Sequence, residues 1–304
     1  MLLHRSSESW RSTERRVLEY LREHGTALGR ELYESLGCDT FRLWRACMLS
    51  ERITLARAGR RYLRLDRRVP GYARLSPSVQ REFLSYTVAG LEEEAVERRL
   101  REVERHIAET SRRKLRLAES IASEVLRATG EDERMCIIIG GDVPLGMAHS
   151  DPRQERSTGE LVAGSDLDVV VILAEGAEEL EERVDELLFR IKLRLLSMPR
   201  KEELDYLIKS WQAAERQLEF GSFRDMVACK VFREAAFLGG SREILSRLRA
   251  EMERRSVVAK LEELERRAAR YREASERLLL ELEEPDEEVL LRTFTTAMEA
   301  EEVL

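Results

Sequence analysis

Residues 135–173 have the sequence MCIIIGGDVPLGMAHSDPRQERSTGELVAGSDLDVVVIL and contain the strongest structural signal in the chain. A short apolar run ends at Gly140-Gly141, and a second apolar run follows Asp166 and Asp168 after a polar loop. Apolar runs of this length, rich in β-branched residues and bounded by turn residues, predict two buried strands.

The two aspartates lie two residues apart at the start of the second predicted strand, so their side chains point the same way. Like charges this close raise each other's pKa, and a buried carboxylate without a partner is costly. A divalent cation with oxygen ligands removes both difficulties, and Mg²⁺ shared with phosphate groups is the usual case. The pair therefore predicts a metal site, and the alternative is an ordinary polar turn.

At these residues the sequence resembles the DNA polymerase β-like nucleotidyltransferase superfamily. The family pattern is a Gly-Gly or Gly-Ser pair, a spacer, an acidic-apolar-acidic triplet on a strand and a third acidic residue on a later strand. The diglycine and Asp166-Leu167-Asp168 match it, and the resemblance covers residues 131–240. It implies two Mg²⁺ ions and the transfer of a nucleoside monophosphate from an NTP, with ATP favoured, to an acceptor hydroxyl.

The resemblance also implies a third catalytic, metal-binding carboxylate beside Asp166 and Asp168. Asp205 fits best because it lies in the strand-like segment ELDYLI, residues 203–208, and Glu219 is the alternative. A charge that faces water at a strand edge would give the same pattern at Asp205.

Four residues are candidates for nucleotide binding. Gly140 and Gly141 would let backbone N–H groups approach the phosphates without a Cβ in the way. Ser165 either orients a phosphate or caps the strand, and Lys230 is either a triphosphate contact or a surface lysine.

The loop between the two predicted strands carries further charged residues. Asp142 follows the glycines, and we expect it to be a helix N-cap rather than a ligand because a carboxylate repels phosphate. His149, Arg153 and Arg156 either touch the triphosphate or the acceptor, or they are only solvated.

Residues 1–75 predict a winged helix, with three short amphipathic helices before the alternating segment ITLARAGRRYLRL, residues 53–65, which predicts a β-hairpin. Arginines outnumber acids between residues 42 and 74, and such a basic stretch is typical of a nucleic-acid interface. A module for protein docking or dimerisation is the alternative. The nucleic-acid candidates are Arg42 and Arg45, on the expected exposed face of the third helix, and Arg57, Arg60 and Arg61.

The remaining segments are helix-rich. Residues 76–130 predict a helical connector that starts at Ser76-Pro77 and breaks near Thr110-Ser111. Residues 131–240 would form an α/β palm with a mixed sheet, in which 223–238 is a helix that ends at a second diglycine. Residues 241–304 predict a C-terminal helical region whose apolar 3,4 spacing packs either on the connector or on a second chain, which gives a monomer or a homodimer. The expected fold class is α+β.

Composition limits the class of protein. The chain has 304 residues, 43% of them apolar and 37% charged, so it can bury real cores. Its net charge of −7 excludes a bulk polyanion binder, and the lack of a long apolar run predicts a cytoplasmic protein without a membrane anchor. The four scattered cysteines predict buried reduced thiols.

The leading hypothesis is therefore a Mg²⁺-dependent nucleotidyltransferase whose acceptor is a nucleic acid, either an RNA such as tRNA or DNA. A second hypothesis keeps the chemistry and transfers the nucleotide to a protein side chain, as AMPylating antitoxin-like members of the superfamily do, and a small-molecule acceptor is a third. A DNA-binding regulator with a nucleotide-sensing palm belongs to another class and predicts no turnover.

Overall fold

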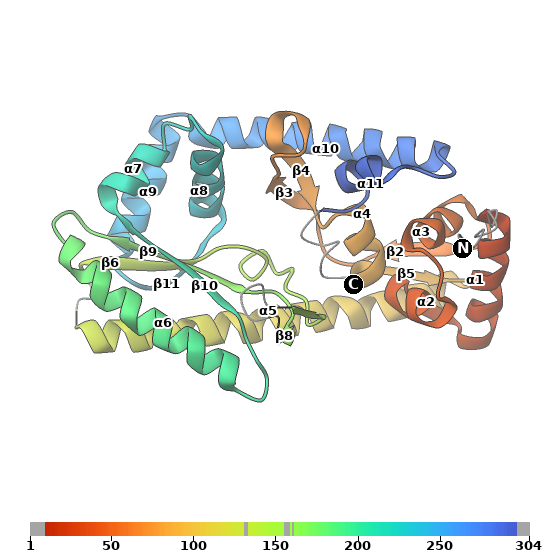
Figure 1. Ribbon diagram of the computed structural model, residues 1–304, viewed down its shortest axis with the longest axis horizontal. Helices are drawn as coiled ribbons and strands as arrows, with labels where there is room; N and C mark the ends of the chain where they lie inside the picture. The colour runs from red at the N-terminus through yellow and green to blue at the C-terminus, as the bar shows by residue number, and fades with distance from the viewer. Residues whose placement is uncertain (1–9, 131–132, 155–158, 160, 297–304) are drawn as a thin grey trace, which may run out of the picture. The chain divides into compact units, whose positions relative to one another are not determined.

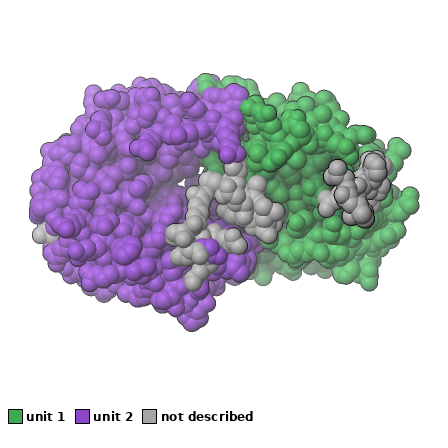
Figure 2. Space-filling model, in the orientation of Figure 1, with its two compact units in different colours: residues 1–64, 73–106, 267–304 green, residues 65–72, 107–266 purple. Residues whose placement is uncertain are grey.

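The computed structural model describes residues 10–130, 133–154, 159 and 161–296. It mixes α-helices with several small β-sheets (Figure 1). The chain divides into two compact units, each built from segments that are distant in sequence (Figure 2). Unit 1 contains residues 1–64, 73–106 and 267–304, and unit 2 contains residues 65–72 and 107–266.

Unit 1 packs three helices against a three-stranded antiparallel sheet with the strand order β1-β5-β2. The buried side chains include Leu18, Leu32, Trp44 and Phe83, which form one apolar core. The helices are α1 (Trp10–His24), α2 (Gly29–Leu36) and α3 (Thr40–Leu49), and the strands are β1 (Thr26–Leu28), β2 (Thr54–Arg57) and β5 (Thr87–Gly90).

The predicted hairpin over residues 53–65 is wrong. Strand β2 pairs with β5, and the next strand, β3 (Tyr62–Leu65), pairs with β4 (Ala73–Ser76). The physical reason is burial, because β5 contributes Val88 and Ala89, which are fully buried between β1 and β2. The three-stranded sheet therefore needs residues beyond 75.

The predicted start of a long helix at Ser76-Pro77 is also wrong. Ser78 caps a single turn, α4 (Val79–Arg81), by accepting the N–H of Arg81 at 3.1 Å. A short π-helical segment, η2 (Glu82–Tyr86), leads into β5, and the long helix α5 (Glu93–Thr129) begins only after it.

Helix α5 continues through Thr110 and Ser111 without the predicted break. Both side chains are buried, and the Ser111 hydroxyl accepts the N–H of Ala148 at 3.1 Å. The polar pair therefore marks a contact with the loop that carries the candidate site, and it does not mark a helix end.

Unit 2 contains a mixed four-stranded sheet with the strand order β10-β9-β6-β11. Only β10 and β9 run parallel, since β6 and β11 each pair antiparallel with their neighbours. The second diglycine lies in β11 and pairs with β6, so the predicted helix over 223–238 is wrong in its last turn. The strands are β6 (Met135–Ile139), β9 (Leu167–Leu173), β10 (Leu204–Ser210) and β11 (Ala236–Gly240).

Helices cover both faces of this sheet (Figure 1). The second half of α5 and helix α6 (Glu181–Ser197) pack on one face, where Ile121, Val171 and Leu188 join a single apolar cluster. The other face carries α7 (Trp211–Gln217), α8 (Phe223–Glu234) and α9 (Arg242–Arg254). The sheet is therefore packed on both faces, and this packing positions the side chains at its strand ends.

The other elements are short, apart from α10. They are η1 (Pro70–Tyr72), β7 (Pro152–Gln154), β8 (Leu161–Ala163), η3 (Glu178–Leu180), α10 (Val257–Glu281) and α11 (Glu287–Thr293). On α10 the predicted apolar positions Leu261, Leu264 and Ala268 are buried within the chain, whereas Leu278 is 41% exposed. All four cysteines are buried free thiols.

None of the helices in the described ranges combines the length and the apolar character that a bilayer-spanning helix needs.

Candidate functional site

Three carboxylates meet where β9 begins and β10 runs alongside it. Asp166 directly precedes β9, Asp168 lies in β9, and Asp205 is the β10 residue paired with Asp168 in the parallel register. One carboxylate oxygen from each of the three lies within 4.8 Å of the other two. Glu219, the alternative third acid, is an exposed residue after α7 and is not part of this cluster.

The negative charges of the acid cluster favour the binding of a cation. Burial raises the pKa of Asp168 well above its ordinary value, and the negative charges of Asp166, Asp142 and Asp205 raise it further, whereas the charge of Lys230 lowers it. A carboxylate in an apolar strand beside three others is unfavourable unless positive charge compensates it.

Arg153 on β7 supplies part of that compensation. Its Nη2 lies 3.6 Å from Oδ2 of Asp166 and 2.7 Å from Oε2 of Glu203, and its Nε donates to the carbonyl of Gly164 at 2.9 Å. Burial raises the pKa of Asp166, and Arg153 opposes that shift. The alternative of a merely solvated side chain is wrong for Arg153, which is buried, while Arg156 lies outside the described residues.

The donor set fits a hard divalent cation. It consists of carboxylate oxygens, which Mg²⁺ prefers, and includes no thiolate or imidazole. Asp205 is the most exposed member, and the Nζ of Lys192 contacts its Oδ1 at 3.2 Å. The residues present therefore fit the Mg²⁺ that the sequence resemblance implies.

The diglycine is shaped around Asp168 rather than left open for phosphate. The N–H of Gly140 donates to the carbonyl of Asp168 at 2.8 Å, so the predicted phosphate contact of this N–H is wrong. Gly141 has a φ of +69°, and a Cβ there would lie 2.1 Å from Oδ2 of Asp168. The N–H of Gly141 makes no hydrogen bond with the described residues, and it stays a candidate donor to phosphate.

Ser165 ties the loop to the strand. Its hydroxyl accepts the N–H of His149 at 3.1 Å and donates to Oδ2 of Asp142 at 3.2 Å, and the residue is only 4% exposed. The single hydroxyl proton is thus already donated, which favours the structural alternative for Ser165. Residues 141–146 form turns, so the predicted helix N-cap at Asp142 is wrong.

Helix α8 brings Lys230 beside the acid cluster. Val231 on the same helix packs against the turn, since a Cβ on Gly140 would lie 3.0 Å from its Cγ1. The Lys230 Nζ contacts Oε2 of Glu234 at 2.6 Å, and its charge acts on Asp168. A triphosphate contact by Lys230 stays a prediction.

The arginines predicted to bind nucleic acid are mostly engaged within unit 1. Arg45 is 9% exposed and its Nε donates to the carbonyl of Leu280 at 3.2 Å, so its predicted exposed position is wrong. Arg57 and Arg61 both pair with Glu82, whose side chain is 10% exposed. The basic stretch between residues 42 and 74 therefore presents less positive charge than its sequence indicates.

Arg42 and Arg60 also keep exposed surface, as Arg57 does with 39% of its side chain exposed, but Arg57 is paired with the largely buried Glu82. Arg60 is exposed, and Arg42, with 32% of its side chain exposed, lies 3.3 Å from Glu284. An exposed ion pair of this kind is weak and exchanges readily. Arg42 and Arg60 remain the better nucleic-acid candidates.

A buried ion pair behind the site was not predicted. The fully buried Lys114 of α5 binds Glu202 and donates to the carbonyl of Ala163 at 2.8 Å, while Nη1 of Arg113 lies 2.5 Å from the same carboxylate. The pair joins α5 to β8 and to the residue two positions before β10. One signal was available, because Lys114 is the first lysine of a chain in which every earlier basic side chain is arginine or histidine.

We expect Lys114→Met to lower the free energy of unfolding by about 3 kcal/mol, because it leaves the Glu202 charge buried with fewer partners. The double variant Lys114→Met/Glu202→Met should lose less than this single variant. Arg190→Met removes an exposed pair with Glu186 and is the matched control, with a change below about 0.5 kcal/mol. Denaturant unfolding measures all three, and equal losses in Lys114→Met and Arg190→Met would contradict the prediction.

Comparison of the sequence with protein-family models and with curated proteins gives no match for this chain.

Proposed function

We propose that this chain is a Mg²⁺-dependent nucleotidyltransferase of the DNA polymerase β-like superfamily, active in the cytoplasm. The observation that carries the proposal is the convergence of Asp166, Asp168 and Asp205 within 4.8 Å of one another. The diglycine turn that closes over Asp168 supports it.

The three aspartates would hold Mg²⁺, which when bound stabilises negative charge on the reacting phosphate. The reaction forms a bond between the acceptor oxygen and the α-phosphorus, breaks the bond to the β-phosphate oxygen and releases pyrophosphate. Asp205 is 51% exposed at its side chain and is the carboxylate best placed to accept the proton of the acceptor hydroxyl. The Gly141 N–H and Lys230 would contact the departing phosphates.

The acceptor is proposed to be a hydroxyl on a nucleic acid. A protein hydroxyl is the second candidate, and a specific observation favours it: Arg45 is buried, and Arg57 and Arg61 are paired with Glu82. A nucleotide-sensing regulator is less well supported, because a sensor without turnover does not need three converging carboxylates.

The test is transfer of label from each α-³²P-labelled NTP in Mg²⁺ to total RNA, to DNA or to protein. Label on one acceptor class, lost in Asp166→Asn/Asp168→Asn, supports the proposal and names the acceptor. Absence of label on all three classes with every NTP would overturn it. Nucleotide binding with DNA binding and no turnover would favour the regulator instead.

A further inference from the structure

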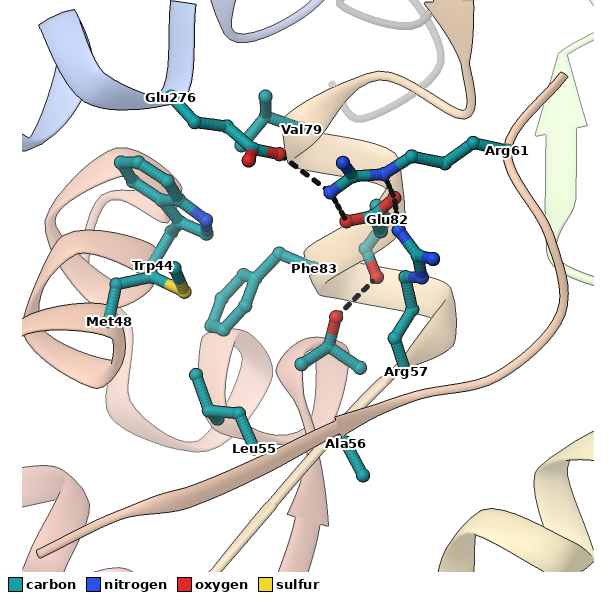
Figure 3. Close-up of a pocket in the computed structure, with 11 residues that line it drawn as sticks. Trp44, Met48, Leu55, Ala56, Arg57, Arg61, Val79, Glu82, Phe83 and Glu276 are labelled. Carbon is teal, nitrogen blue, oxygen red and sulfur yellow. Dashed lines mark hydrogen bonds and ion pairs between the residues drawn. The ribbon is translucent and has the colours of Figure 1, made fainter. Parts of the chain in front are cut away.

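A pocket of about 290 Å³ lies within unit 1, among α3, β2, the α4–η2 segment and α10 (Figure 3). Its volume is at the lower end of the range for small-molecule sites. Trp44, Leu55 and Phe83 give it an apolar interior, and arginine and glutamate side chains line one side. No step of the proposed transferase reaction uses these residues.

Trp44 offers an unused hydrogen-bond donor in this pocket. The residue is 5% exposed, and its indole N–H makes no hydrogen bond with any residue in the described ranges. Water still reaches this nitrogen, because it is not one of the solvent-inaccessible polar atoms that lack a partner, so the donor is open to an acceptor on a ligand. Figure 3 shows the indole nitrogen on the edge of the ring that faces the interior of the pocket.

The charged residues that line the pocket are Arg57, Arg61, Glu82 and Glu276. The buried Arg272, which lies outside the lining, contacts both carboxylates, so the ion-pair cluster at the pocket has one more arginine than it has carboxylates. Both carboxylates are already saturated by guanidinium groups at 2.5–3.2 Å. The site is therefore electrostatically suited to an anion rather than to a cation.

Arg57 carries the available part of that charge. It makes one hydrogen bond, from Nη1 to Oε2 of Glu82 at 3.2 Å, and its side chain is 39% exposed. Arg61, by contrast, donates twice to Glu82 and once to Glu276. The remaining N–H groups of Arg57 can bind a ligand carboxylate without breaking an ion pair.

We propose that this pocket binds a small aromatic carboxylic acid. The ring would lie between Trp44 and Phe83, the carboxylate would meet Arg57, and a polar group on the ligand would accept the Trp44 N–H. The one extra positive charge of the arginine–glutamate cluster matches the single negative charge of a monocarboxylate. A nucleoside triphosphate carries far more negative charge and is too large for the pocket volume of about 290 Å³. The site is thus separate in chemistry from the acid cluster of unit 2.

The test uses calorimetric titration of the full-length protein with indole-3-acetate and with 4-hydroxybenzoate. We expect at least one probe to bind with a Kd between about 10 μM and 1 mM, in line with its size. The primary amide of the same probe, which lacks the charge, should bind about tenfold more weakly or worse.

Variants assign the binding to this pocket. Arg57→Gln and Trp44→Phe should each weaken binding by about tenfold, whereas Arg60→Gln, an exposed neighbour that does not line the pocket, should not change it. Thermal melting checks that each variant is folded, and Arg57→Gln, a change at the surface, remains informative if Trp44→Phe unfolds.

Several outcomes would overturn the proposal. They are failure of both probes to bind, equal binding of the amides, or equal losses in Arg57→Gln and Arg60→Gln. A loss of probe binding in Asp168→Asn would place the probe in the acid cluster and would also overturn it. Transferase activity does not enter these measurements, so the proposed function and this site can fail independently.

Discussion

Asp168→Asn should remove Mg²⁺-dependent nucleotide transfer and, at neutral pH without metal, should make the protein more stable. Activity should fall by a factor on the order of 10³, because the variant loses a charged ligand of the Mg²⁺ that would stabilise negative charge on the reacting phosphate. The melting temperature in EDTA should rise by a few degrees, equivalent to about 1 kcal/mol, because a buried carboxylate facing three others becomes neutral.

The direction of the stability change follows from the raised pKa of Asp168. A group with a higher pKa in the folded state than in the unfolded state binds its proton more tightly when folded. Without metal, this group therefore stabilises the folded wild-type protein fully below its ordinary pKa of 3.8, and the contribution is lost as the pH rises through the raised pKa of the folded state. Asparagine does not titrate, so Asp168→Asn should be more stable than the wild-type protein near neutral pH, and this difference should disappear in acid.

Mg²⁺ should reverse the order of stability. The wild-type protein should melt at a higher temperature when Mg²⁺ is added, because a ligand that binds only the folded state stabilises it. Asp168→Asn should respond little. Glu219→Gln is the matched control, since Glu219 is an exposed acid outside the cluster, and it should behave as wild type in activity, EDTA and Mg²⁺. Unchanged turnover in Asp168→Asn, or loss of turnover in Glu219→Gln, would refute the site.

The central strands and their acids could be predicted because their signals are local. A run of β-branched residues predicts β9, and the two-residue period predicts which way Asp166 and Asp168 point. The third acid is expected from the family resemblance, and the apolar neighbours of Asp205 favour it over Glu219. The parallel pairing of β9 with β10, which the structure shows, places Asp205 opposite Asp168.

The partners of β2 and of the arginines could not be predicted, because those choices are made by residues far along the chain. Alternation in residues 53–65 fits a local hairpin as well as it fits pairing with β5, and only the burial of Val88 and Ala89 decides between them. Likewise, the residues next to Arg61 in sequence predict an exposed positive charge. In the structure Arg61 pairs with Glu82 and Glu276, which lie 21 and 215 residues further along the chain.

Gly141→Ala should weaken metal binding at a modest cost in stability. The φ of +69° makes any side chain at this position unfavourable by about 1 kcal/mol. The added methyl group would also lie 2.1 Å from Oδ2 of Asp168, so the carboxylate must rotate away from Asp166 and Asp205. Side-chain rotation is inexpensive for folding, but it removes one of three ligands from its position.

Gly146→Ala separates these two effects. Gly146 has the same φ of +69° in the same run of turns, but a Cβ there meets no atom within 4 Å. Both variants should therefore lose about 1 kcal/mol of stability in EDTA, measured by thermal melting. Only Gly141→Ala should weaken Mg²⁺ binding, by about 10- to 100-fold in a titration followed by calorimetry, with a parallel fall in transfer. If the two alanine variants bind Mg²⁺ equally well, the Asp168 carboxylate does not need the space that Gly141 leaves, and the turn has no part in shaping the acid cluster.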